Sequence, residues 1–207
     1  PGKRTAFRLL RSLVRLPERV WRHLYFSGPF DVHIDSNASF RIFHNGHMVE
    51  NEIFWSGLFG AFEGQSLKAW CDLASQSYGI IDLGANSGVC ALAAEAVNPG
   101  ARVYAIEPFP PVVEVLARNL ELNESPVQLH RVTISDHVGQ ERLFSTSQST
   151  FEYSASLNDD FNPDADAFTM VEVTTLDALL DRHPLDSVDL IKIDTEGQEV
   201  AVLSGMR

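Results

Sequence analysis

The stretch that decides the fold is IIDLGANSGVC, residues 80–90. An apolar run ends at an acid, Asp82, and glycines follow at positions 84 and 88 before the chain becomes rich in alanine. The pattern predicts a buried strand over 79–83, a tight turn, and a helix over about 87–97. Glycine at such a turn lets the backbone approach a ligand or another segment closely.

The chain after this turn continues to alternate between strands and helices. Apolar runs predict strands over 102–108, 127–135 and 188–194, and amphipathic segments predict helices over 111–123 and 175–183. Shorter strand-like pieces occur before the last helix of this set. Such alternation is typical of an α/β fold with a doubly wound, mostly parallel sheet.

Two segments precede this core, which we place at residues 79–207. In the lead-in, residues 31–78, positions 31–45 alternate like a hairpin and positions 50–76 look helical. The side chains expected to be buried in that helical part are Phe54, Leu58, Phe62, Leu67, Trp70 and Leu73. The first segment, residues 1–30, is a basic amphipathic helical arm, which Pro17 divides into two helices with the proline near the start of the second.

The charge of the chain is unevenly distributed. Residues 1–30 hold seven Lys/Arg and one acid, a charge of +6, whereas residues 31–207 hold nine Lys/Arg and 27 acids, a charge of −18. Nucleic-acid binding depends on neutralising phosphates, so the acidic body argues against a nucleic-acid partner. In the arm, arginines recur at steps of three and four and form one stripe on a helix: Arg4, Arg8, Arg11, Arg15, Arg19 and Arg22.

Three interpretations of the arm stay open. The arm packs its apolar side on the domain and turns its arginines to water, or it lies as an amphipathic helix on an anionic membrane or contacts a partner. An Arg-rich, acid-poor segment is also typical of a trimmed transit peptide. Of these we favour packing on the domain.

Several classes of protein are disfavoured by composition. No apolar run reaches about 18 residues, so no transmembrane helix is expected. Cys71 and Cys90 look like ordinary residues of apolar helix faces, and together these features favour a cytoplasmic location, peripheral to a membrane if the arm binds one. No cluster has the spacing of a metal site, and His44 and His47 flank the turn signal Asn45-Gly46.

A second acid completes a pocket with the glycine turn. Glu107 ends the next predicted strand, 19 residues after Gly88. In parallel sheets ligands bind at the carboxyl ends of the strands, and an acid at this position accepts hydrogen bonds from the hydroxyls of a ribose. Gly84, Gly88 and Glu107 therefore predict a pocket for an adenosine-like ligand.

The acid before the turn separates two cofactors. A dinucleotide site needs G-x-G-x-x-G, but here Asn86 stands where the second glycine would be. The charge of Asp82 would repel a pyrophosphate and attract the ammonium group of S-adenosylmethionine. The residues favour S-adenosylmethionine over a nicotinamide dinucleotide.

Five separated blocks carry a family resemblance: IIDLGANSG, VYAIEPFPPVVEVLARNLELN, VTISDHVG, VTTLDALL and VDLIKIDTEGQEVAVLSG. In this order they resemble the FkbM-type family of S-adenosylmethionine-dependent methyltransferases over about residues 50–205. The resemblance implies a class I, Rossmann-like methyltransferase fold. It also implies methyl transfer to a hydroxyl oxygen of a sugar or another small metabolite, which would be the partner of the site.

The resemblance also assigns site residues. It implies that the cofactor turn comprises Asp82, Gly84, Ala85, Asn86 and Gly88. Glu107 corresponds to the ribose acid, and Pro108 and Phe109 would border the adenine, with Phe109 offering a stacking face. Ser135 and Asp136 match the block that faces the adenine amine in the family.

Two acids are candidates for catalysis. Asp194 ends the fourth core strand and is the first candidate for the base or the orienting group, and Glu196 is the second. Glu196 is alternatively an acid that opens the next helix. Lys192 is expected on the other face of its strand, and Glu63 lies in a region that could fold over the site.

The sheet expected for the family continues beyond IKIDTEGQEVAVLSG, whereas this chain ends at position 207. We therefore expect a fold truncated after the fourth core strand, with the C-terminal strands missing. Two alternatives to an active O-methyltransferase stay open. One is a methyltransferase-like binding or interaction module, or an inactive fragment, and the other is a nucleotide-dependent oxidoreductase.

Overall fold

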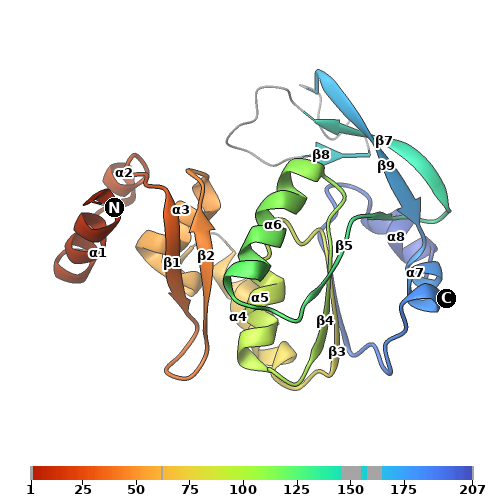
Figure 1. The fold of residues 1–207 in the computed structure, drawn as a ribbon, viewed down its shortest axis with the longest axis horizontal. Coiled ribbons are helices and arrows are strands. Elements are labelled where there is room, and N and C mark those ends of the chain that lie inside the picture. The colour runs from red at the N-terminus through yellow and green to blue at the C-terminus, as the bar shows by residue number, and fades with distance from the viewer. Residues whose placement is uncertain (1, 62, 146–154, 158–164, 207) are drawn as a thin grey trace.

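The computed structural model describes residues 2–61, 63–145, 155–157 and 165–206. Its centre is a sheet of four parallel strands: β3 (Gly79–Leu83), β4 (Arg102–Ile106), β5 (Gln128–His130) and β10 (Leu190–Ile193). Their order across the sheet is β10-β3-β4-β5. The chain therefore winds from β3 outward to β5 and then returns to the other side of β3 (Figure 1).

Helices cover both faces of this sheet. Alternate side chains of a strand point to opposite faces, so Ile80 belongs to one apolar cluster and its neighbour Ile81 to the other. The first cluster packs the sheet against α4 (Gly64–Ala74), α5 (Val89–Val97) and α6 (Pro110–Leu122). The second packs it against α7 (Leu176–Arg182) and α8 (Glu199–Ser204). The expectation of a doubly wound parallel sheet is confirmed.

The lead-in segment contains the expected hairpin. Strands β1 (Gly28–His33) and β2 (Ser39–His44) pair antiparallel, and β2 lies beside α6. Asn119 of α6 is fully buried between the hairpin and the glycine turn. Its side chain accepts a hydrogen bond from the Phe43 amide at 2.8 Å and donates one to the Ser87 carbonyl at 2.8 Å. The hairpin is thereby tied directly to the glycine turn.

The continuous helix expected over 50–76 is wrong, because the segment is broken in the middle. Helix α3 (Met48–Ser56) ends at Gly57, which has φ +78°, and a short 3-10 turn, η1 (Leu58–Gly60), precedes α4. Of the side chains expected to be buried, Phe54, Leu58 and Trp70 are buried, whereas Leu73 points to solvent. Phe62 lies outside the described residues, and Leu67 is partly buried against the core.

The third core strand expected over 127–135 is also wrong in its extent. It divides into β5 and β6 (Thr133–Ile134), which belong to different sheets. The ladder with β4 ends where the Glu107 amide donates to the His130 carbonyl, and β6 then pairs parallel with β9 (Ala167–Thr174). Strand β9 pairs antiparallel with β7 (Gly139–Ser145), which pairs with the short β8 (Ala155–Ser156). This second four-stranded sheet rises beyond the carboxyl end of the parallel sheet (Figure 1).

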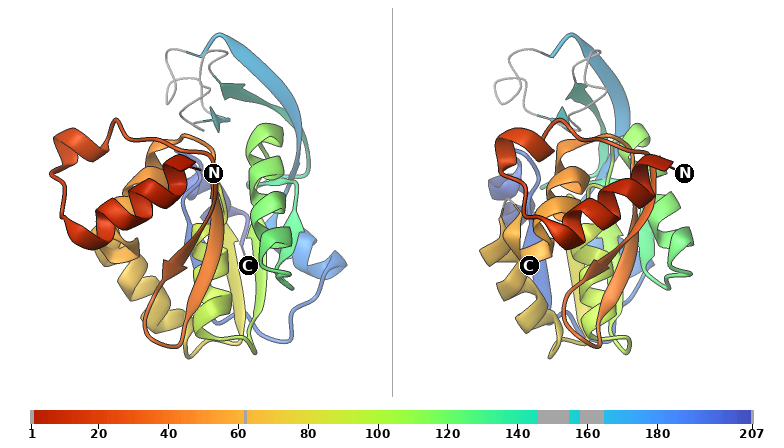
Figure 2. Two further views of the ribbon diagram at one scale, coloured as in Figure 1. Left: turned by 60° about the vertical axis from the view of Figure 1, so that its left-hand side comes forward. Right: turned by 90° about the vertical axis from the view of Figure 1, so that its left-hand side faces the viewer.

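The arm consists of α1 (Gly2–Leu13) and α2 (Glu18–Trp21), and Pro17 precedes α2 as predicted. It lies beside the hairpin at the end of the molecule away from β7 and β9 (Figure 2). The arm packs on the domain as expected, with Trp21 buried and Phe7 against Trp55, but the expected division of α1 into an apolar inner side and a basic outer side is wrong. Arg4 donates to the Pro29 carbonyl, Arg8 pairs with Asp31, and the apolar Leu9 and Leu13 face solvent.

No helix among the described residues is both long enough and apolar enough to cross a membrane.

Candidate functional site

A cavity lies at the carboxyl ends of β3, β4 and β10. It is the place where the strand order reverses, since the chain leaves β3 in one direction and returns beside it as β10. Its walls come from six segments: Leu83, Gly84, Asn86, Ile106, Glu107, Pro108, Phe109, Val132, Thr133, Ile134, Leu143, Ser156, Leu157, Asp194, Thr195, Glu196 and Gln198. The lining combines apolar side chains with three acids, Glu107, Asp194 and Glu196.

The glycine turn is shaped by close contacts within the protein. Gly84 has φ +73°, and a Cβ at this position would lie 1.8 Å from the carbonyl oxygen of Asp194. Gly88 has φ +89°, and a Cβ there would meet the Leu116 side chain at 2.4 Å. Only glycine fits either position without displacing a neighbour. Gly84 lets the turn lie against the loop after β10, and Gly88 lets α5 begin against α6.

Two backbone amides fix the position of the Glu107 carboxylate in the cavity. One carboxylate oxygen accepts the Asn86 amide and the other accepts the Phe109 amide, each at 3.0 Å. These bonds hold the carboxylate between the glycine turn and the start of α6. Burial raises the pKa of Glu107 to about 7, although the two amide hydrogen bonds act in the opposite direction. Each oxygen keeps a further acceptor position for a ligand hydroxyl.

An ion-paired group lies beneath the glycine turn. The ammonium of Lys192 is 3.2 Å from a carboxylate oxygen of Asp82 and 3.3 Å from one of Asp194, and it donates to the Gly84 carbonyl at 3.2 Å. Burial opposes the charge of Lys192, but Asp82 and Asp194 outweigh it and raise the pKa of the amine. The expectation that Lys192 faces away from Asp194 is wrong, because residues two apart on a strand share a face.

The loop after β10 presents Glu196. This residue has φ +53°, and its carbonyl accepts a hydrogen bond from the Ser156 hydroxyl at 2.6 Å. Glu199 fixes the loop by accepting the amides of Thr195 at 2.9 Å and Gly197 at 3.3 Å. Burial raises the pKa of Glu196, and the nearby charges of Asp194 and Glu199 raise it further.

The structure brings together some of the residues that the sequence predicted and places others elsewhere. The predicted residues on the cavity wall are Gly84, Asn86, Glu107, Pro108, Phe109, Asp194 and Glu196. Asp82, Ala85 and Gly88 lie in the same turn but not on the wall, and Asp82 is fully buried against Lys192. Asp82 therefore already has a positively charged partner within the protein, although burial still raises the pKa of its carboxyl.

Ser135 and Asp136 are also not on the cavity wall. The Ser135 amide donates to the Thr174 carbonyl, and Asp136 is exposed and bonded to His137 at 2.8 Å. The wall at this level comes instead from Val132, Thr133 and Ile134, which sequence reasoning did not single out. The sequence signal that could have found them is the charged residue Arg131 within the strand predicted over 127–135. The chain leaves the parallel sheet at this residue.

Sequence reasoning also missed Leu143, Ser156, Leu157, Thr195 and Gln198. Leu143 faces the cavity from β7, at the antiparallel pair with Thr169 of β9. Leu143, Ser156 and Leu157 reach the site only when the second sheet packs over the first, so no local pattern marks them, whereas Thr195 and Gln198 lie in the loop after β10 beside the predicted acids.

The chain is similar in sequence to known methyltransferases. A family model described as the methyltransferase FkbM domain matches residues 82–207, which is more than half of the chain. The methyltransferase sdnD of Sordaria araneosa is 29% identical over 154 residues, which cover 61% of this chain and 60% of the relative. A solved S-adenosylmethionine-dependent methyltransferase from Agrobacterium tumefaciens aligns with a TM-score of 0.37 and 13% identity, over 57% of this chain and 42% of its own.

Proposed function

The chain belongs to the FkbM methyltransferase family, and on that premise we propose that it uses S-adenosylmethionine to methylate a hydroxyl group of a small acceptor such as a sugar. The observation that carries the proposal is the carboxylate of Glu107 on the cavity wall, anchored by the amides of Asn86 and Phe109. An anchored acid at the end of the second strand suits the paired hydroxyls of a ribose.

The remaining cavity residues fit the other parts of this cofactor. Phe109 and the apolar side chains Val132 and Ile134 offer a surface for an adenine ring. Asp194 and Glu196 offer negative charge to the cationic end of the molecule. Since Asp82 is fully buried and does not line the cavity, these two acids and not Asp82 would meet the ammonium or the sulfonium.

The chemistry divides between the cofactor and the chain. S-adenosylmethionine supplies an activated methyl group, so the protein contributes binding, orientation and proton transfer. An acceptor hydroxyl has to lose its proton, and the carboxylate of Glu196 is suited to take it because its raised pKa makes it a stronger base near neutrality. Asp194, held by Lys192, would orient the same hydroxyl as a fixed hydrogen-bond acceptor.

We also propose a cytoplasmic location. The support is that Cys71 and Cys90 are both free thiols, as expected in a reducing compartment.

Cofactor binding is tested by calorimetric titration of S-adenosylmethionine into the chain and into Glu107→Gln. We expect a dissociation constant in the micromolar range for the unchanged chain, about −8 kcal/mol. Removing the charged acceptor of two hydroxyl hydrogen bonds should weaken binding by about 10- to 100-fold. Glu114→Gln, on the exposed face of α6, is the matched control and should bind as the unchanged chain does.

Titration of NAD in the same experiment separates this proposal from an oxidoreductase. A folded chain that binds NAD more tightly than S-adenosylmethionine, or binds neither, would contradict the proposed cofactor. Equal affinity of Glu107→Gln and the unchanged chain would show that the cofactor does not use this carboxylate.

Methyl transfer is tested by incubating the chain with labelled S-adenosylmethionine and a panel of sugars and other hydroxylated compounds. Once an acceptor is found, Glu196→Gln should lower kcat by about 10²- to 10⁴-fold, the usual contribution of a general base. Its affinity for S-adenosylmethionine should fall by a smaller factor, because Asp194 remains to meet the cationic end of the cofactor. Label that appears on nitrogen or carbon of the acceptor would refute O-methylation.

A further inference from the structure

Helix α1 turns an apolar stripe toward solvent. Gly2, Ala6, Leu9 and Leu13 follow one another at steps of four and three, and all four are exposed, Leu9 by 60% and Leu13 by 80%. Residues at this spacing lie on one face of a helix. Val14 and Val20, also exposed, extend apolar surface beyond the end of α1.

The opposite face of α1 holds the helix in this orientation. Phe7 packs edge-on against Phe26, with ring centroids 6.4 Å apart, and lies 5.6 Å from Trp55. The Arg11 guanidinium donates to the Phe54 carbonyl and lies 5.2 Å from the centre of the Phe54 ring. Because an aromatic anchor and arginine contacts occupy the inner face, the leucines remain on the outside.

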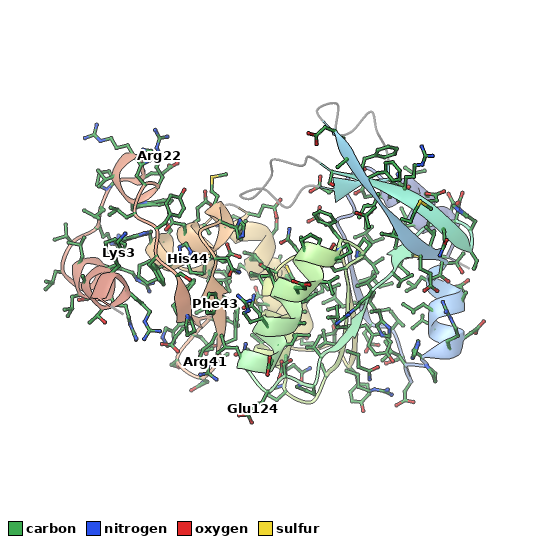
Figure 3. The ribbon with its side chains drawn as sticks, turned by 45° about the horizontal axis from the view of Figure 1, so that its top comes forward. Lys3, Arg22, Arg41, Phe43, His44 and Glu124 are labelled. Atoms are coloured by element: carbon green, nitrogen blue, oxygen red, sulfur yellow. The ribbon has the colours of Figure 1, made fainter. Side chains whose placement is uncertain are left out.

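The arm that carries the apolar stripe also exposes basic side chains. Lys3, Arg15, Arg19 and Arg22 are all exposed, and Figure 3 shows Arg22 pointing away from the rest of the molecule. The first 30 residues carry +6, whereas the remaining residues carry −18. The arm is therefore the positive end of an otherwise acidic molecule.

From these observations we propose that the arm is a docking surface for an anionic lipid membrane. Helix α1 would lie in the plane of the interface, with Leu9 and Leu13 among the acyl chains and the basic side chains at the headgroups. With 12 residues it is about 18 Å long, so it lies on a bilayer and does not span it.

The charge distribution of the chain and the exposed leucines together favour an anionic membrane over a nucleic acid as the partner of the arm. The acidic body is repelled by an anionic surface, which leaves the arm as the end that approaches it. An RNA or DNA partner would use the charges but not the exposed leucines, whereas a bilayer interface uses both. The inference is independent of the methyl-transfer chemistry, since no arm residue lines the cavity at the sheet.

The test is flotation of the full chain with vesicles of phosphatidylcholine alone and with vesicles that also contain phosphatidylglycerol. We expect binding to the anionic vesicles, little binding to the neutral ones, and a loss of binding as salt is raised. The double variant Leu9→Glu/Leu13→Glu should weaken binding by at least about tenfold. The matched control Val138→Glu/Leu203→Glu changes two exposed apolar residues outside the arm and should bind as the unchanged chain does.

A second variant tests the charges without touching the apolar stripe. Arg15→Glu/Arg19→Glu reverses two exposed arginines and should also weaken binding to the anionic vesicles, by about tenfold or more. Thermal unfolding of each variant verifies that the fold is retained.

Three results would overturn the proposal. They are equal binding to neutral and anionic vesicles, unchanged binding of Leu9→Glu/Leu13→Glu, and absence of binding by the folded chain. If light scattering then shows a dimer that Leu9→Glu/Leu13→Glu dissociates, the stripe is an interface between copies of this chain.

Discussion

The parallel sheet and the N-terminal region each bury a carboxyl group, and they accommodate it in different ways. Asp82 of β3 is fully buried and has the Lys192 ammonium 3.2 Å away. Glu50 of α3 is 1% exposed, and within the described part of the chain it forms no ion pair and its Oε2 has no hydrogen-bond partner. Burial raises the pKa of Glu50 to about 7.

The difference lies in what opposes the cost of burying an acid. Register places Lys192 directly beside Asp82 across the β10–β3 pair, so the positive charge is supplied by another segment of the chain. Burial raises the pKa of both carboxyls, but at Asp82 the charge of Lys192 opposes the rise, whereas no positive charge of the described residues opposes it at Glu50. Removing the partner of Asp82 and removing the charge of Glu50 should therefore change stability in opposite directions.

The largest effect is expected for Lys192→Met, which would leave Asp82 buried and unpaired as Glu50 is. We expect the free energy of unfolding to fall by about 3–5 kcal/mol, measured by urea denaturation at neutral pH. In the double variant Asp82→Asn/Lys192→Met the unpaired charge is gone, so most of that loss should be recovered.

Lys68→Met is the control, because Lys68 is exposed on α4. Its removal should change the free energy of unfolding by less than about 0.5 kcal/mol. A Lys192→Met variant as stable as the control would show that Asp82 does not depend on its partner.

A smaller effect, visible as pH dependence, is expected for Glu50→Gln. The folded pKa of about 7 lies above the reference value of 4.5, so the folded state binds more protons between these values. The stabilisation that the protonated Glu50 gives the folded state is complete below about pH 4.5 and is lost as the pH rises through 7. Glutamine cannot titrate, so its variant keeps what the unchanged chain loses. From below pH 4.5 to above pH 7, the free energy of unfolding of the variant should rise by about 3 kcal/mol relative to that of the unchanged chain.

The measurement is urea denaturation of both proteins at several pH values, compared as a difference so that titrations common to both cancel. Glu52→Gln, on the same helix and less buried, is the matched control for the change of side chain. Parallel profiles for Glu50→Gln and the unchanged chain would mean that Glu50 is ionised in the folded protein at neutral pH.

The smallest effect is expected for Arg8→Ala, which removes an exposed pair. Arg8 and Asp31 are 3.3 Å apart, but their side chains are 60% and 42% exposed. Solvent screening weakens the attraction within such pairs. The free energy of unfolding should therefore fall by only about 0.2–0.5 kcal/mol, and by less in high salt. A loss above about 1 kcal/mol would indicate that this pair, and not Phe7 and Arg11, fixes the orientation of α1.

Much of the core was predictable from the sequence. The α/β, Rossmann-like methyltransferase fold is confirmed, as are the strand before Gly84, the helix after Gly88 and the placement of Glu107 at the end of its strand. These features are local, since hydrophobic period, glycine at a turn and the spacing between turns lie within short stretches of chain. The arginine stripe of α1 was readable for the same reason.

Only the tertiary structure decided how those local pieces meet. The break between β5 and β6 depends on a pairing with β9, some forty residues further along the chain. The ion pair of Lys192 with Asp82 depends on the register of strands more than a hundred residues apart. The periodicity of α1 shows that it has two faces, but the contacts of Phe7 and Arg11 determine which one is inside. The sequence determined the elements and the turn that holds Glu107, because these follow from local sterics and hydrophobic period. Their packing partners were decided by the fold, because those contacts join segments that no local pattern connects.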